Sequence, residues 1–119
     1  MCKQKIASPL SIEEINLIEG TGLPLIDRHH LRLLAHCLAC FKLMAKGSPS
    51  GSFPNEEDRL KWLTSQSVFN NEKDFILVFL EQLSGAGKQL EVLAKEYNIS
   101  PLELTLERLI DSKLGQSNT

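Results

Sequence analysis

The sequence predicts an all-α protein, a compact bundle of five to six helices around one long central helix at about residues 25–45. Apolar residues recur at spacings of three and four along most of the chain, which is the period of an amphipathic helix. Residues that start and stop helices separate these stretches. The continuous apolar run at residues 75–80 has no second strand-like segment to pair with. We therefore expect a helix at 75–83, with a buried strand as the alternative.

The first helix and the start of the central helix are marked by capping residues. Ser11 and Glu14 have the spacing of a capping box, and Gly20 can supply the left-handed residue that follows a helix. The central helix is expected to begin at Pro24 or just after Asp27. Proline suits the first helical position, and aspartate is a good N-cap.

Two apolar stripes run side by side along the central helix. They consist of Leu31, Leu34, Leu38, Phe41 and Ala45 in the first stripe, and Leu33, Cys37, Cys40 and Met44 in the second. An apolar arc of this width is more than one partner helix can cover. We therefore expect this helix to be contacted on several sides, to have apolar surface left over for a partner, and to end at Gly47.

A loop and a further pair of helices follow the central helix. Residues 47–54 have the glycine, serine and proline content of a flexible loop. We expect Asn55 to cap the helix after this loop and Asn71 to start the next one. Gly85 and Gly87 are expected to loosen or end that second helix, because glycine is a poor helix former.

Two more helices are expected after these glycines. The first covers residues 90–97 and stops at Asn98. The second begins with a capping box at residues 100–103, where proline takes the first helical position. Gly115 is expected to end this last helix and to leave residues 116–119 frayed.

Length and composition limit the domain count and the class of protein. The 119 residues, 42% of them hydrophobic and 24% charged, fit a single helical domain over residues 1–119. A net charge of −2 gives no general attraction to nucleic acid or to an anionic membrane. The three cysteines are too few for a disulfide scaffold, and the longest apolar run is too short to span a bilayer. We therefore expect a cytoplasmic protein that does not contact a membrane.

A basic stripe lies on the polar side of the central helix and is the candidate interaction surface. It contains Arg28, Arg32, His36, Lys42 and Lys46, and no acidic residue occurs between the first and last of them. Such a stripe can bind phosphate or an acidic partner. The ordinary alternative is a solvated face that pairs with the acidic second half of the chain, where eleven Asp and Glu residues face seven Lys and Arg.

The central helix also carries a C-x-x-C motif, Cys37 to Cys40, next to His36. His36 and Cys40 are one turn apart, so they could offer two metal ligands, with a second copy of the chain offering two more. Redox chemistry needs the first cysteine at a helix N-terminus, and this pair is in mid-helix. The ordinary interpretation is that both cysteines are small core residues.

Residues 90–110 have the outline of a helix-turn-helix, with Ala94 small enough for a close crossing and a tight turn at residues 98–100. The would-be recognition helix is acidic, however, and would repel phosphates. It displays Glu103, Glu107 and Asp111 against Arg108 and Lys113. This composition argues against nucleic acid as the partner.

No arrangement of residues suggests a catalytic nucleophile or a cofactor site. The leading hypothesis is therefore a non-enzymatic interaction or regulatory module that binds another protein or forms a homodimer. The first alternative is a nucleic-acid-binding regulator that uses residues 90–110. The second is a metal or redox protein that uses His36, Cys37 and Cys40.

Overall fold

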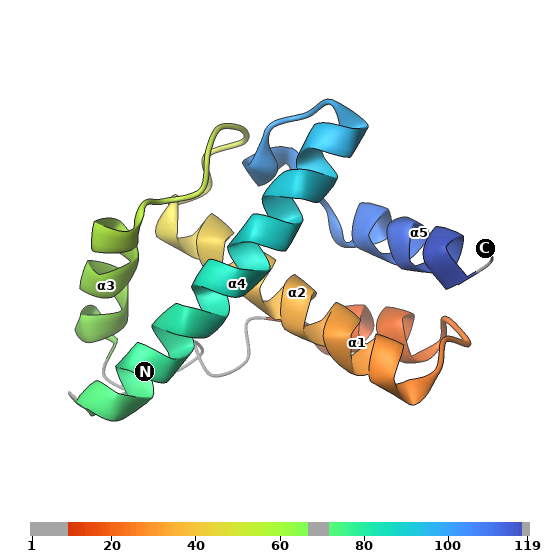
Figure 1. Ribbon diagram of the computed structural model, residues 1–119, viewed down its shortest axis with the longest axis horizontal. Coiled ribbons are helices and arrows are strands. Elements are labelled where there is room, and N and C mark those ends of the chain that lie inside the picture. The colour runs from red at the N-terminus through yellow and green to blue at the C-terminus, as the bar shows by residue number, and fades with distance from the viewer. Residues whose placement is uncertain (1–9, 67–71, 118–119) are drawn as a thin grey trace.

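The computed structural model describes residues 10–66 and 72–117, and these ranges are helical with connecting loops and contain no strand (Figure 1). The elements are α1 (Ile12–Glu19), α2 (Leu25–Met44), α3 (Glu56–Ser65), α4 (Lys73–Tyr97), the 3₁₀ turn η3 (Pro101–Glu103) and α5 (Leu106–Ser117). The predicted all-α bundle is therefore confirmed.

Local capping sets the starts of α1 and α3. The Ser11 hydroxyl accepts from the Glu14 N–H at 3.1 Å, and the Glu14 carboxylate accepts from the Ser11 N–H at 2.8 Å. The Asn55 side chain accepts from the Asp58 N–H at 2.9 Å. These bonds satisfy N–H groups that have no partner within the helix. α2 begins directly after Pro24, whose φ of −56° is already helical.

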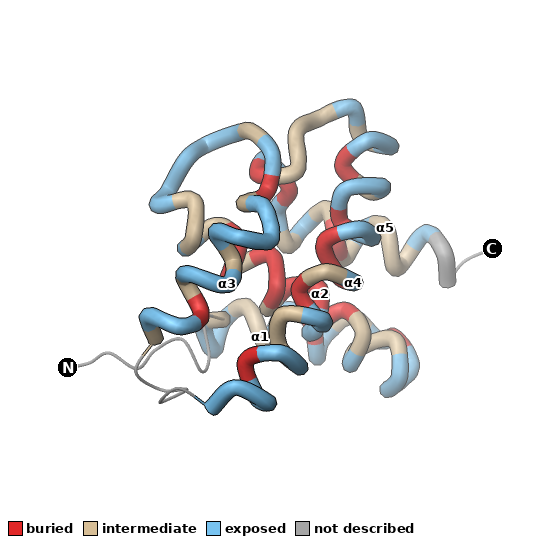
Figure 2. Tube along the Cα trace, turned by 60° about the vertical axis from the view of Figure 1, so that its left-hand side comes forward, coloured by how far each residue is buried: buried red, intermediate tan, exposed pale blue. Residues whose placement is uncertain are grey.

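α2 is the central helix of the bundle. It packs against α1, α3, α4, η3 and α5, and α4 crosses it (Figure 1). The residues that it buries are Leu31, Leu34, Ala35, Cys37, Leu38, Cys40 and Phe41. Both predicted stripes are thus used for packing, and Figure 2 shows the buried positions gathered where the helices meet. Leu33, at 39% exposed, is the stripe residue that remains at the surface.

α4 runs unbroken for 25 residues, so the expectation that Gly85 and Gly87 end or loosen a helix is wrong. Gly87 is buried at the crossing, where a Cβ atom would lie 3.3 Å from Cζ of Phe41. A glycine costs about 0.5–1 kcal/mol in a helix relative to alanine, and the close approach to Phe41 explains its presence. The expected start at Asn71 lies outside the described residues.

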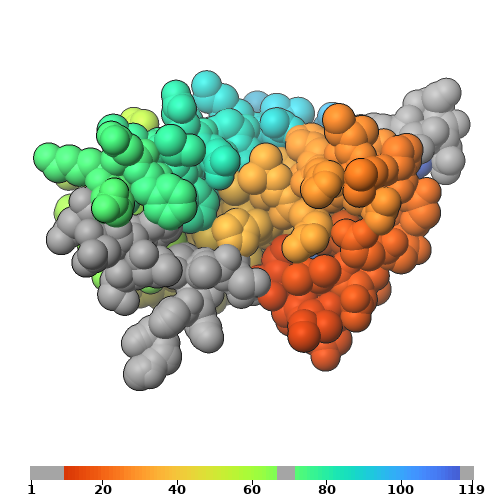
Figure 3. All heavy atoms as spheres, turned by 90° about the horizontal axis from the view of Figure 1, so that it is seen from below, coloured from red at the N-terminus to blue at the C-terminus, as the bar shows by residue number. Residues whose placement is uncertain are grey.

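Residues 75–83 are helical, as predicted, but they are not all buried. Ile76 and Leu83 face the core, whereas Phe75, Leu77 and Val78 are 59%, 58% and 54% exposed. In Figure 3 this first part of α4, coloured green, lies at the surface on one side of the molecule, away from α1, which is coloured red.

The capping box at Ser100 forms, but the helix predicted from it does not continue. The chain makes the single turn η3, extends at Leu104 and starts α5 at Leu106. The chain leaves the helical path at Leu104, whose side chain is fully buried. α5 then starts from a new cap, because the Thr105 hydroxyl accepts from the Arg108 N–H at 3.3 Å. The Leu102 N–H, which has no partner within a helix at this position, donates to the Gly51 carbonyl at 3.0 Å.

The last helix also extends beyond its expected end. α5 includes Gly115 and reaches Ser117, and no atom would lie within 4 Å of a Cβ at Gly115, so no packing feature forces a stop there. Gly115 is therefore not the terminator, and residues 116–117 are helical rather than frayed. Residues 118–119 lie outside the described residues.

The loop at 47–54 has irregular backbone and one buried anchor. Phe53 is 7% exposed and stacks on Phe41 with ring centroids 4.2 Å apart. The Gly51 N–H donates to the Ser100 hydroxyl at 2.9 Å. The loop thereby joins the end of α2 to η3 and completes the core on that side.

Candidate functional site

The predicted basic stripe is divided among several environments. Arg28 forms an ion pair with Glu19 of α1, and its Nε donates to the Leu23 carbonyl at 3.1 Å. Arg32 lies 3.9 Å from the other oxygen of the same carboxylate. The acid that pairs with these arginines is thus on the preceding helix, and not in the second half of the chain, where the ordinary alternative placed it.

The other members of the stripe point elsewhere. His36 stacks on Phe79 of α4 with ring centroids 5.9 Å apart. Lys42 is half-buried near Glu14, and Lys46 lies beyond the end of α2 with a φ of 56°. The structure therefore brings the two arginines together over Glu19 and leaves Lys42 and Lys46 near the other end of α2. As a binding surface for phosphate or an acidic partner, the stripe stays a prediction.

His36 has an unusual environment. Its Nε2 is buried and has no hydrogen-bond partner among the described residues. Burial disfavours the charged imidazolium and lowers the pKa of His36 below its ordinary value. The ring therefore packs as a neutral aromatic group between α2 and α4, which does not suit it to bind an anion.

Cys37 and Cys40 lie in the core, fully buried and free of any disulfide. Burial raises the pKa of Cys37 to about 11. Burial and the nearby Cys37 raise the pKa of Cys40 to about 12. A thiol must ionise to attack or to bind metal, so these two side chains are suited to packing. No group of metal-ligating side chains occurs within residues 10–66 and 72–117, and Cys2 lies outside those ranges.

The predicted helix-turn-helix is only partly formed. Asn98 ends α4 in the left-handed conformation with a φ of 62°, and the Ile99 N–H bonds to the Ala94 carbonyl at 3.0 Å. This is the expected tight turn. The expected recognition helix is absent, however, because η3 and the extended Leu104 separate the turn from α5.

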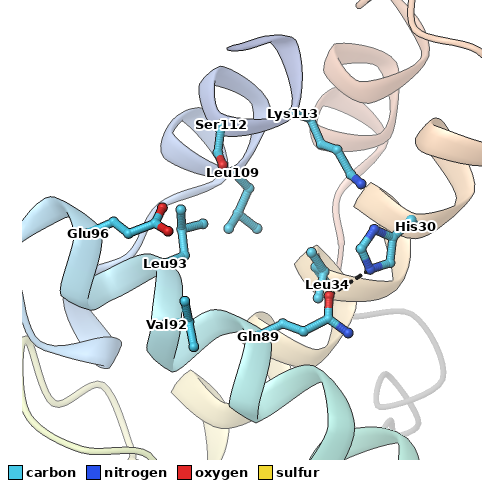
Figure 4. A pocket seen from close by; sticks show the side chains of 9 residues that line it. All are labelled: His30, Leu34, Gln89, Val92, Leu93, Glu96, Leu109, Ser112 and Lys113. Carbon is cyan, nitrogen blue, oxygen red and sulfur yellow. Dashed lines mark hydrogen bonds between the residues drawn. The ribbon is translucent and has the colours of Figure 1, made fainter. Parts of the chain in front are cut away.

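The structure instead shows a groove where α2, α4 and α5 meet, with a volume of about 320 Å³ (Figure 4). Leu34, Leu93 and Leu109 line it, one from each helix, and of these Leu34 and Leu109 are buried core residues. Val92 adds an apolar side chain that is 58% exposed. The polar side chains that line the groove are His30, Gln89, Glu96, Ser112 and Lys113.

One hydrogen bond ties two walls of this groove together. His30 Nε2 on α2 lies 2.9 Å from Oε1 of Gln89 on α4 (Figure 4). Ser112 lies on the other side of the groove from His30 in the same view. A nucleophile and its base must lie within hydrogen-bond reach. The arrangement therefore offers surface for binding rather than a nucleophile with its base.

Sequence reasoning missed this groove. Val92 gave one usable sign, since it is apolar yet lies outside the buried face of residues 90–97, between the charged Glu91 and Lys95. Ser112 and Lys113 gave none. Their positions depend on the direction of α5, which the break at Leu104 sets.

No helix in the described part of the chain is both long enough and apolar enough to cross a membrane. No curated protein and no solved structure is significantly similar to the chain. A family model described as NDH complex assembly factor CRR9 matches residues 10–119, which is nearly the whole chain. The chain therefore belongs to the family of the NDH complex assembly factor CRR9.

Proposed function

We propose that this protein is a non-enzymatic assembly factor that binds protein subunits of the NDH complex while that complex is being built. The observation that carries the proposal is the family match over residues 10–119. The groove between α2, α4 and α5 is the surface that we assign to a segment of such a subunit. The protein acts by holding its partner, and no bond is made or broken.

The composition of the groove supports this role. Protein interfaces have an apolar centre and a polar rim that forms hydrogen bonds. Here Leu93 and the exposed Val92 supply the apolar surface over the buried Leu34 and Leu109, and side chains such as Gln89 and Lys113 supply polar groups around it. A volume of about 320 Å³ lies near the lower end of small-molecule pockets, and it suits one or two side chains of a protein segment.

A regulatory role and a homodimer remain predictions. The apolar width of α2 predicts a dimer. The surrounding helices cover most of its two stripes, but Leu33 at 39% and, outside the stripes, Leu25, Ile26 and Leu43 at 61%, 76% and 52% remain exposed. Light scattering of the full chain at several concentrations tests the dimer. A mass equal to one chain at every concentration would rule out the homodimer and would not contradict the assembly role.

The assembly role is tested by removing the gene in the native organism and measuring the NDH complex by native gel electrophoresis. We expect the complex to be depleted and to return with the wild-type gene. Val92→Lys places a charge in the groove and should restore little complex. Glu91→Lys, the neighbouring exposed position outside the groove, is the control and should restore it. A normal amount of complex after gene removal would contradict the proposed function.

A further inference from the structure

A second groove lies between the first turn of α3 and the outer face of α4. Its volume is about 430 Å³. It is lined by Glu56 from α3 and by Leu77, Val78, Leu80, Glu81 and Ser84 from α4. It is separate from the groove of Figure 4, because the two share no lining residue.

The apolar side chains of this second groove are unusually open to solvent. Leu77 is 58% exposed and Val78 is 54% exposed, and the two are adjacent in the chain. Single exposed apolar residues are common on protein surfaces. Two neighbours in one hollow, with the half-buried Leu80 beside them, form a patch of the kind that marks a binding site.

The charges of this groove have one sign. Glu56 and Glu81 line it from the two helices, and no basic residue lines it among the described ones. Glu57 and Asp58 add negative charge in the same turn of α3. The nearest arginine in sequence, Arg59, is directed inward.

Arg59 does not line the groove, and two contacts hold its side chain against the protein. Its Nε donates to the Pro54 carbonyl at 2.8 Å. Its guanidinium lies over the Phe41 ring, 4.9 Å from the centroid. The acidic side chains of the groove therefore have no compensating arginine from α3, and a partner with positive charge would complement them.

We propose that the α3–α4 groove binds an amphipathic helix of a partner protein, in which lysine or arginine residues flank the apolar ones. The apolar face of that helix covers Leu77 and Val78, and its cations pair with Glu56 and Glu81. An anionic lipid surface or a nucleic acid would be repelled by the same carboxylates. The kind of helix that binds is inferred from the residues of this groove alone. Only the statement that the partner takes part in assembly rests on the proposed function.

Two synthetic peptides of about 18 residues test this proposal, because helices much shorter than that are marginal in water. Both carry leucines along one helical face. One has lysines beside that face and the other has glutamates at the same positions. Fluorescence anisotropy with the purified full chain should show the lysine peptide binding at least about tenfold more tightly than the glutamate peptide. Its affinity should fall as salt rises, because the charges are at the surface.

Variants locate the binding. Leu77→Ser removes apolar surface and Glu81→Lys reverses a charge, and each should weaken the lysine peptide by about tenfold or more. Glu91→Lys makes the same charge change on the same helix outside the groove and should leave the affinity within about twofold. All three positions are exposed, so the melting temperatures should match that of the wild type.

Several outcomes would overturn the proposal. They are equal affinity for the two peptides, no binding of the lysine peptide, and unchanged binding by Leu77→Ser and Glu81→Lys. Self-association of the chain that Leu77→Ser abolishes would also overturn it, because a second copy would then be the occupant. If the lysine peptide binds but the NDH complex is normal after gene removal, the proposed function is refuted. The α3–α4 groove would still be a binding site for a basic amphipathic helix.

Discussion

The two faces of α4 differ in how they use their apolar residues. At the crossing with α2, Gly87 lies so close to Phe41 that a Cβ would approach its ring to 3.3 Å. Phe41 is itself fully buried and stacks on Phe53. On the outer face, Leu77 and Val78 are more than half exposed and contribute little to this packing.

The difference separates the residues that make the fold from those that are available for a partner. Packing at the crossing is so close that a side-chain volume change must move a neighbour. The outer face can change without disturbing any core contact. Substitutions at the crossing should therefore alter the free energy of unfolding, and substitutions on the outer face should alter binding alone.

The largest effect is expected at Phe41. Phe41→Ala leaves a cavity under Phe53 and Arg59 and should lower the free energy of unfolding by about 3–5 kcal/mol. Urea denaturation followed by circular dichroism measures the change. A loss below about 1 kcal/mol would mean that the crossing is not the centre of the core.

Gly87 and Gly85 form a matched pair two residues apart. Gly87→Leu forces a side chain against Phe41 and should cost about 1–3 kcal/mol. Gly85→Ala places a methyl group where no atom lies within 4 Å and should stabilise α4 by about 0.5–1 kcal/mol. Thermal unfolding of both variants distinguishes a packing glycine from a neutral one, and equal effects of the same sign would refute the distinction.

Acidification should weaken the α2–α4 contact at His36. Burial lowers the pKa of this imidazole in the folded protein below the unfolded value of 6.5. As the pH falls below 6.5, the unfolded chain binds a proton that the folded chain does not, so stability is lost. The loss levels off once the pH is below the folded pKa. Urea denaturation at pH values between 7.5 and 5 should show the decline.

His36→Gln provides the control for this pH dependence, because glutamine does not titrate in that range. The decline in stability should be shallower in the variant than in the wild type. Identical pH profiles would show that protonation of His36 does not contribute to the decline.

The smallest effect on stability is expected on the outer face. Leu77→Lys changes a side chain that is 58% exposed, so the free energy of unfolding should change by no more than about 0.5 kcal/mol. Denaturation in urea tests this directly. A loss above about 2 kcal/mol would mean that Leu77 contributes to the core and that the two faces are not separable.

The sequence predicted helix starts well because capping is local. Ser11 bonds to Glu14, and Asn55 bonds to Asp58, each within three residues. Breaks that depend on distant contacts were not predictable. The glycine at 87 is explained by Phe41 on another helix, and the interruption before α5 comes where Leu104 is buried in the core.

The candidate site was less predictable than the fold for the same reason. The basic stripe was recognised from spacing alone, whereas its partner Glu19 comes from the fold of α1 against α2. The groove of Figure 4 combines side chains from three helices. Sequence spacing gives the face of each helix but not which faces meet. Among the apolar residues of that groove, Val92 alone lies outside the apolar face of its own helix.

The central claim is that the outer surface of α4 binds partners and can be changed without unfolding the protein. The double variant Leu77→Lys, Val92→Lys tests it most directly, because the two positions are about 22 Å apart along the helix and should act independently. Introduced into the native organism in place of the wild-type gene, it should accumulate normally, melt at the wild-type temperature and leave the NDH complex depleted on native gels. A wild-type amount of NDH complex with this folded variant would contradict the account.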